Sequence, residues 1–150
     1  MQFPEIRALK QIYWQFFVTL TFADPIPPSK VQHIATFSWL RDLAAAGHVH
    51  FKRLLWVRRY EVGQPGERGH FHFCIAGLPS RSTQTFTRQM ETLWRQRTGG
   101  FADIRRYEPT RGGLGYILKT PQTMAWATDQ DEQYPTLSKS LFATLRRCRM

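Results

Sequence analysis

Two histidines separated by a single residue are the clearest candidates for chemistry in this sequence. His70 and His72 lie in the apolar run His70–Ala76, which has the composition of a strand. Residues two apart in a strand project from the same face, so the two imidazole rings are able to share one metal ion. Glu61 ends the preceding strand-like segment, and an antiparallel hairpin between the two segments places its carboxylate beside His70 as a third ligand.

Two nitrogens and one oxygen, with positions left open for water or substrate, suit Mn²⁺, Mg²⁺ or Zn²⁺ in a catalytic role. Two other carboxylates compete for the third position, because Glu67 lies nearer to the histidines in sequence and Asp103 lies on a further predicted strand. A His-x-His pattern is also common by chance. It fits a half-buried polar pair, or a strand of a different fold such as a cupin-like barrel, so the pair alone does not decide for a metal.

A tyrosine and a lysine near residue 120 offer a nucleophile and a cation. Tyr116 and Lys119 are three residues apart in a short predicted helix, 111–120, and therefore lie on one side of it. The pKa of a phenol is about 10, so at neutral pH a cation must stabilise the phenolate, or a metal must polarise the phosphate that it attacks. Lys119 and the metal could provide these two effects. For either residue alone, a packed tyrosine or a solvated lysine is the simpler interpretation.

The segments that must position these residues alternate between strand and helix patterns. Strands are predicted at 16–22, 51–61, 70–76 and 101–107, where β-branched and aromatic residues run between turn residues. Helices are predicted at 29–47 and 83–97, and a last one near the C-terminus, from apolar residues at helical spacing: Ile34, Phe37, Leu40, Leu43, Ala44; Phe86, Met90, Leu93, Trp94; Leu137, Leu141, Leu145. In the first of these helices, Ser29 and Gln32 have the form of a capping box and Gly47 is a fitting end.

The predicted order is therefore β-α-β-β-α-β, followed by one or two helices. This is an α+β fold of the RRM or ferredoxin-like kind, in which an antiparallel sheet carries helices on one face and leaves the other open to a ligand. The short helix that carries Tyr116 comes after this unit. A length of 150 residues supports one core, so the whole chain, 1–150, is predicted to form a single domain.

The charge of the chain points to a polyanionic partner. The sequence has 21 Lys+Arg against 11 Asp+Glu, a formal charge of +10 that favours nucleic acid, although an arginine-rich coding bias is the simpler alternative. Trp56 or Tyr60 could stack on bases, although burial in the core is the simpler interpretation of Trp56 and each arginine is as consistent with a solvated surface position. The arginines on strands or loops near the candidate site, which could follow a nucleic-acid backbone, are Arg58, Arg59, Arg105, Arg106 and Arg111.

Membrane and disulfide chemistry are not expected. No stretch approaches the ~20 apolar residues of a membrane span, and the first residues lack a signal-peptide pattern, which predicts a cytoplasmic protein without a membrane partner. Cys74 and Cys148 lie far apart and lack the spacing of a disulfide framework or a thiolate zinc site. Both are predicted to be free thiols.

Three ordered segments together resemble the motifs of the HUH endonucleases, in particular the rolling-circle replication initiators (Rep proteins) of plasmids and of single-stranded DNA phages and viruses. The segments are FVTLTF at 17–22, GHFHF at 69–73 and YILK at 116–119. The resemblance covers roughly residues 16–120, and the order, separation and predicted strand, strand and helix settings of the motifs agree with that family.

The resemblance implies an activity and the residues that perform it. His70 and His72 would bind a divalent cation, Mn²⁺ or Mg²⁺ with Zn²⁺ also possible, completed most plausibly by Glu61. Tyr116 would attack the scissile phosphate of single-stranded DNA, leaving a 5′-phosphotyrosine link and a free 3′-hydroxyl, and Lys119 would orient or assist it. Only one tyrosine occupies the third motif, which is the pattern of a single-tyrosine enzyme.

Further expectations concern the DNA and its delivery. The first motif would be structural and close to DNA, which makes Thr19 and Thr21 candidate DNA contacts. The exchange of a phosphodiester for a phosphotyrosine needs no nucleotide cofactor, and no G-x-x-x-x-G-K-[ST] loop is present. The substrate would be single-stranded DNA or an origin hairpin, delivered by supercoiling or by a partner helicase.

Three other functions compete with this one. A single-tyrosine transposase of the same superfamily would use the same residues. A non-catalytic, RRM-like module would bind single-stranded nucleic acid through aromatic residues on the sheet. A metal hydrolase for small molecules, using His70 and His72, would be favoured by a barrel fold that is poor in helices. The helical periodicity around Ile34 and Phe86 speaks against such a fold.

Overall fold

The computed structural model describes residues 4–61, 69–79, 84–118, 136–138 and 141 of the chain. Four long strands and one short one form a single antiparallel sheet in the order β4-β1-β3-β2-β5. The strands are β1 (Phe16–Thr21), β2 (Leu55–Glu61), β3 (His70–Ala76), β4 (Phe101–Arg106) and β5 (Thr136–Leu137). The helices are α1 (Pro4–Gln11), α2 (Ser29–Ala46), α3 (Gln84–Thr98) and α4 (Gly113–Leu118), with short 3-10 turns η1 (Phe51–Arg53) and η2 (Pro109–Arg111).

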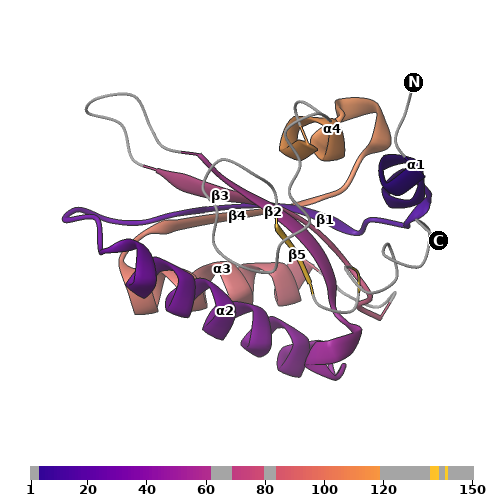
Figure 1. Cartoon of the computed structure of the whole chain (residues 1–150). Coiled ribbons are helices and arrows are strands. Elements are labelled where there is room, and N and C mark those ends of the chain that lie inside the picture. The colour runs from indigo at the N-terminus through magenta and orange to yellow at the C-terminus, as the bar shows by residue number, and fades with distance from the viewer. Residues whose placement is uncertain (1–3, 62–68, 80–83, 119–135, 139–140, 142–150) are drawn as a thin grey trace.

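The β-α-β-β-α-β order predicted from the sequence is confirmed by β1-α2-β2-β3-α3-β4. The architecture is α+β and compatible with an RRM-like fold. Figure 1 shows α2 and α3 side by side on one face of the sheet, with α1 and α4 on the other.

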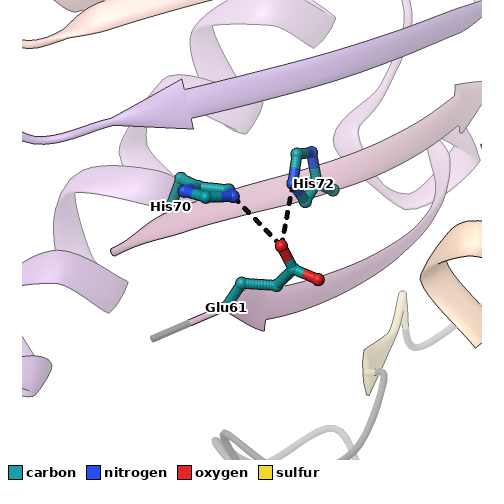
Figure 2. Close-up of side chains that lie close together, drawn as sticks. All are labelled: Glu61, His70 and His72. Carbon is teal, nitrogen blue, oxygen red and sulfur yellow. Dashed lines mark hydrogen bonds and ion pairs between the residues drawn. The ribbon is translucent and has the colours of Figure 1, made fainter. Parts of the chain in front are cut away.

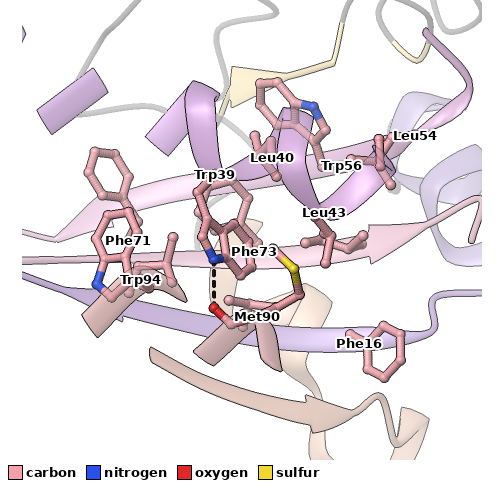
Figure 3. Close-up of a cluster of buried hydrophobic side chains, with 14 of the residues drawn as sticks. Phe16, Trp39, Leu40, Leu43, Leu54, Trp56, Phe71, Phe73, Met90 and Trp94 are labelled. Atoms are coloured by element: carbon pink, nitrogen blue, oxygen red, sulfur yellow. Dashed lines mark hydrogen bonds between the residues drawn. The ribbon is translucent and has the colours of Figure 1, made fainter. Parts of the chain in front are cut away.

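The main core lies between the sheet and the α2–α3 layer (Figure 3). Burial alternates along β1, because Phe16, Val18 and Leu20 point to the helices while the residues between them face the other side. Trp39 and Trp94 are completely buried, and each indole N–H donates to a backbone carbonyl, of Met90 and of Thr21 respectively, so neither burial leaves an unpaired donor.

The opposite face is not entirely open, which corrects the prediction of one uncovered face. The central strands place apolar groups there too, among them Val57 and Cys74, and α1, α4 and β5 cover them in a second buried cluster. Strands that are apolar on both faces must be covered on both faces. Helix α1, formed by residues 4–11, provides part of this cover, and the sequence patterns did not predict it. The uncovered part of this face lies toward the Glu61 end of the β2–β3 pair, where the histidines are.

Helix α2 matches the predicted span, but its start and its buried stripe differ from the prediction. Ser29 is the first helical residue after Pro28 and makes no capping hydrogen bond, while the Gln32 side chain donates to the Pro27 carbonyl at 2.8 Å. Ile34 is 61% exposed, because the buried stripe runs through polar as well as apolar residues. The residues of that stripe are Gln32, His33, Thr36, Trp39, Leu40, Leu43 and Ala44.

The C-terminal region also differs from the prediction where it is described. Leu137 lies in β5 and pairs with Val57 of β2, not in an amphipathic helix. Leu141 is buried in the second cluster, and Leu145 lies outside the described residues. Cys74 is a buried free thiol whose pKa is raised by burial, and Cys148 is outside the described residues. Within the described parts of the chain, every helix is too short or too polar to cross a membrane.

Candidate active site

The β2–β3 hairpin places a carboxylate directly opposite the first histidine. Glu61 pairs with His70 in the register of the two strands, as predicted from the sequence, and His72 lies two residues further on the same face. Glu61 Oε2 is 3.1 Å from His70 Nε2 and 3.5 Å from His72 Nε2. Figure 2 shows the carboxylate oxygen between the two rings.

This group has the chemistry and the spacing of a metal site. Its ligand atoms, two imidazole nitrogens and one carboxylate oxygen, all lie within 4.8 Å of one another. Ligands about 2.1 Å from a common ion and 90–110° apart are separated by about 3.0–3.4 Å. The 3.1 Å distance from Glu61 to His70 lies within this range, and the 3.5 Å distance to His72 lies just above it. The three residues therefore fit a divalent cation with few ligands from the protein, the arrangement that leaves positions for substrate.

The neighbouring strand fixes the orientation of one candidate ligand, His72. Thr19 of β1 lies opposite His72, and its Oγ1 is 3.0 Å from His72 Nδ1. When Nδ1–H donates to this hydroxyl, Nε2 presents its lone pair on the side of Glu61, as a metal ligand must. Thr19, predicted as a DNA contact, thus holds His72 in the structure.

One competing carboxylate, that of Asp103, is not part of this group. Asp103 lies on β4, beyond Thr19, and pairs with Arg105 at 2.8 Å between Oδ2 and Nε. Among the described residues, the cluster of potential ligands contains only Glu61 and the two histidines. Glu67 lies outside the described residues.

The short helix α4 brings Tyr116 to the same carboxylate oxygen. Leu114, Ile117 and Leu118 are buried in the second cluster and fix one side of α4, while Tyr116, on its other side, is 43% exposed. The Tyr116 hydroxyl donates to Glu61 Oε2 at 2.8 Å. Its ring meets the His72 ring edge to face, with centroids 5.0 Å apart.

The surroundings of Tyr116 keep its hydroxyl protonated at rest. The hydrogen bond to the Glu61 carboxylate raises the pKa of Tyr116, and burial and the negative charge of Glu61 raise it further, while the Arg59 guanidinium acts in the opposite direction. A cation at the site would oppose this rise, because it offsets the charge of Glu61. Lys119, the predicted helper, lies outside the described residues.

The predicted DNA-contacting residues separate into two groups. Arg58 points away from the site into the α2–α3 layer and is 2% exposed, so the prediction that it follows a DNA backbone is wrong. Trp56 is buried on that side as well, and Tyr60 packs against Phe71, so neither presents an open ring for base stacking. The cause is strand alternation, which sends every second residue of β2 to the closed face.

Arg59 and Arg105 lie on the face of the site, whereas Arg106, opposite Phe16 at the end of β4, contributes to the wall of a neighbouring cavity. Arg59 is opposite His72 and buried, with 8% of its surface exposed, whereas Arg105, Arg106 and Arg111 are exposed and line this cavity beside Tyr116. Thr21 is half-buried opposite His70.

One aromatic residue of this region was not singled out from the sequence. Phe17 stacks on the His72 ring with centroids 5.6 Å apart and also lines the cavity. The signal that could have identified it is its position two residues before Thr19, which places it on the same face of β1.

Comparisons with protein-family models, with curated proteins and with solved structures find no match to this chain. The assignment of a function therefore depends on the geometry of the site and on the sequence motifs.

Proposed function

We propose that this chain is a single-tyrosine HUH endonuclease that nicks and rejoins single-stranded DNA through a 5′-phosphotyrosine link. One observation carries the proposal. The hydroxyl of Tyr116, which α4 positions, lies 2.8 Å from the carboxylate oxygen that also contacts both histidines. A nucleophile and a candidate cation site meet here although they are separated by more than forty residues of sequence.

The three ligand residues would hold Mn²⁺ or Mg²⁺, with Zn²⁺ as a further candidate. Such an ion supplies Lewis acidity, which withdraws charge from an oxygen of the scissile phosphate. His70 and Glu61 face each other across the hairpin, and Thr19 orients His72, so the protein presets the ligands on rigid strands.

Tyr116 supplies the attacking oxygen. Its hydrogen bond to Glu61 directs the hydroxyl toward the space in front of the histidines and offers a path for the phenol proton to leave. In the reaction, a bond forms between the phenol oxygen and phosphorus, and the bond from phosphorus to the 3′-oxygen breaks. The phosphotyrosine retains a phosphate ester, so a 3′-hydroxyl can reverse the reaction without a nucleotide cofactor.

The positive charge supports a DNA substrate. We assign backbone contacts to Arg59, Arg105, Arg106 and Arg111, and we leave out Arg58 because it is buried on the other face. Lys119 is proposed to assist Tyr116.

The cellular role that we propose is initiation of rolling-circle replication of a plasmid or phage. The cytoplasm would be the compartment, and the substrate would be single-stranded DNA or an origin hairpin presented by supercoiling or a helicase. Transposition by a single-tyrosine enzyme would use the same chemistry.

The test is a search for the covalent intermediate. The protein is incubated with randomised single-stranded oligonucleotides and Mn²⁺, and adducts are separated on a denaturing gel. We expect an adduct with the unmodified protein and with the control Tyr13→Phe, whose side chain is 82% exposed. We expect none with Tyr116→Phe or after chelation of the metal. An adduct that persists in Tyr116→Phe contradicts the proposal.

A non-catalytic nucleic-acid-binding module is the second candidate. It is favoured by the antiparallel sheet and by aromatic residues on the partly open face, Phe17 on β1 and Phe101 on β4, the latter 66% exposed. Binding of DNA that is unchanged by chelator and by His70→Ala, in the absence of any adduct, would select this candidate.

A further inference from the structure

A cavity lies beside Tyr116, between the β1–β4 pair and the segment 107–113. Its volume is about 300 Å³, which is at the lower end of the range for pockets that hold small ligands. Such a volume suits one planar group better than a complete nucleotide. The cavity is separate from the three metal-ligand candidates except at His72, which forms part of its wall.

Aromatic rings line this cavity. The Phe17 ring is nearly parallel to that of His72, at an interplanar angle of 25°. Tyr107 lies on another side, and its hydroxyl accepts a hydrogen bond from the Leu114 amide at 3.4 Å, which ties its ring to the start of α4. Gly113 allows both rings to lie close to the start of α4, because a Cβ there would lie 2.7 Å from a ring carbon of Phe17 and 3.2 Å from one of Tyr107.

Cationic side chains surround the opening. Arg105, Arg106 and Arg111 line the cavity together with a single carboxylate, Glu108. Arg111 pairs with Glu108 and Arg105 with Asp103, but all four side chains are about half exposed or more. Exposed ion pairs contribute little free energy, so these arginines can exchange a carboxylate for a phosphate at small cost.

We propose that this cavity binds a nucleobase of the DNA strand next to the scissile phosphate, with Phe17 as the stacking surface. The inference rests on the proposed function, in which Tyr116 at the cavity wall attacks that phosphate. Aromatic rings that stack on a base, with arginines that hold the adjoining phosphates, are the combination by which proteins bind single-stranded DNA. Because Tyr116 lies at the cavity wall, the cavity is placed to receive the base of a nucleotide that carries the reacting phosphate. With Phe17 in this role, the rate of cleavage depends on the base next to the scissile phosphate.

The first experiment tests whether Phe17 and one base act together. A single oligonucleotide that forms the adduct is selected, the cut is located from its bound and released fragments, and the whole strand is resynthesised with an abasic site at either nucleotide flanking the cut. With the unmodified protein we expect roughly a 10-fold slower formation of the adduct for one of the two abasic substrates. Phe17→Leu is expected to cause a similar loss with the intact strand and no further loss with that abasic strand. The control Phe37→Leu, at a partly buried position on the α2–α3 side, retains the full difference between the strands.

The second experiment measures binding without cleavage. Tyr116→Phe protein is titrated with fluorescein-labelled dT20, with thermal melting as a check that each variant folds. We expect Phe17→Leu and Arg111→Ala to weaken binding and Arg95→Ala, exposed on α3, to leave it unchanged.

The outcomes separate the two proposals. The base site is overturned, and nicking is left intact, if the rate of adduct formation is insensitive to both abasic sites. The same conclusion follows if the losses of rate from Phe17→Leu and from the abasic site simply multiply. Absence of any adduct, with dT20 binding that still depends on Phe17, overturns nicking and retains the base site.

Discussion

Two histidines pack against opposite faces of the sheet, and both are at least nine-tenths buried, yet their surroundings differ. His33 of α2 lies on the closed face, where an Arg58 nitrogen is 3.0 Å from its Nδ1. The guanidinium of Arg58 lies within 5.1–5.5 Å of the ring centroids of Phe37, Trp56 and Phe71. This polar pair is enclosed by aromatic rings and has no access to a ligand.

His72 on the other face is buried to a similar extent but has different neighbours. Its Nδ1 contacts Thr19, and its Nε2 faces Glu61 beside the partly exposed Tyr116. The two histidines show that burial of a polar group does not by itself indicate a site. A chemically useful histidine also needs one ring nitrogen directed at a group that is open to solvent or substrate.

The largest expected effect comes from removing His72, the candidate metal ligand on the open face. His72→Ala should abolish measurable Mn²⁺ binding by calorimetry, since only two potential ligands of the described cluster remain. The control His48→Asn changes an exposed histidine with positive φ to a residue that tolerates this conformation, and it should bind Mn²⁺ normally. If His72→Ala and His48→Asn bind Mn²⁺ with equal affinity, His72 is not a metal ligand, and the proposed contrast between it and His33 fails.

On the closed face, a substitution of Arg58, the partner of His33, should affect the stability of the fold. Arg58→Ala leaves a cavity among the rings and removes the partner of His33, so we expect a loss of about 3–5 kcal/mol in the free energy of unfolding, measured with urea. Arg58→Met fills the same space without a charge and should recover most of that loss. If instead Arg58→Ala retains its stability and loses DNA binding, the arginine belongs to the proposed DNA site after all.

Acid should act on the closed face through His33. Burial, and then the charge of Arg58, lower the pKa of His33 to about 4, below the ordinary value of 6.5. The folded protein therefore binds fewer protons than the unfolded chain between these values, so this stabilisation is complete above pH 6.5 and is lost as the pH falls toward 4. Between pH 6 and 5 we expect the free energy of unfolding to fall by about 1 kcal/mol more than in His33→Gln. Parallel pH profiles for the two proteins would contradict this assignment.

A smaller effect is expected from the group that orients His72. Thr19→Val preserves the shape of the side chain and removes the oxygen that contacts Nδ1. We expect Mn²⁺ affinity to fall by about 10- to 100-fold, with a melting temperature close to that of the unmodified protein. Thr21→Val, opposite His70 on the same strand, is the matched control and should bind Mn²⁺ with unchanged affinity.

Much of the architecture could be predicted from local patterns. The strands that carry Thr19, His72 and Glu61, and the register that places Glu61 opposite His70, follow from alternation and from a hairpin between adjacent segments. The start of α2 was less predictable, because Ser29 matches a capping sequence without making the cap. Ile34 was assigned to the core for a similar reason, since a helical period does not say which stripe faces the sheet.

The sequence alone determined the types of the candidate metal ligands and the common face of His70 and His72, because both depend on residues close together along the chain. Tertiary structure decided that Tyr116 meets Glu61, that Arg58 turns away from the site, and that Phe17 lines a cavity. These outcomes depend on how α4 packs against apolar side chains of the central strands, and on which face of β2 the helices α2 and α3 close. Contacts between distant segments are set by the packing of the whole core, which no local pattern of residues contains.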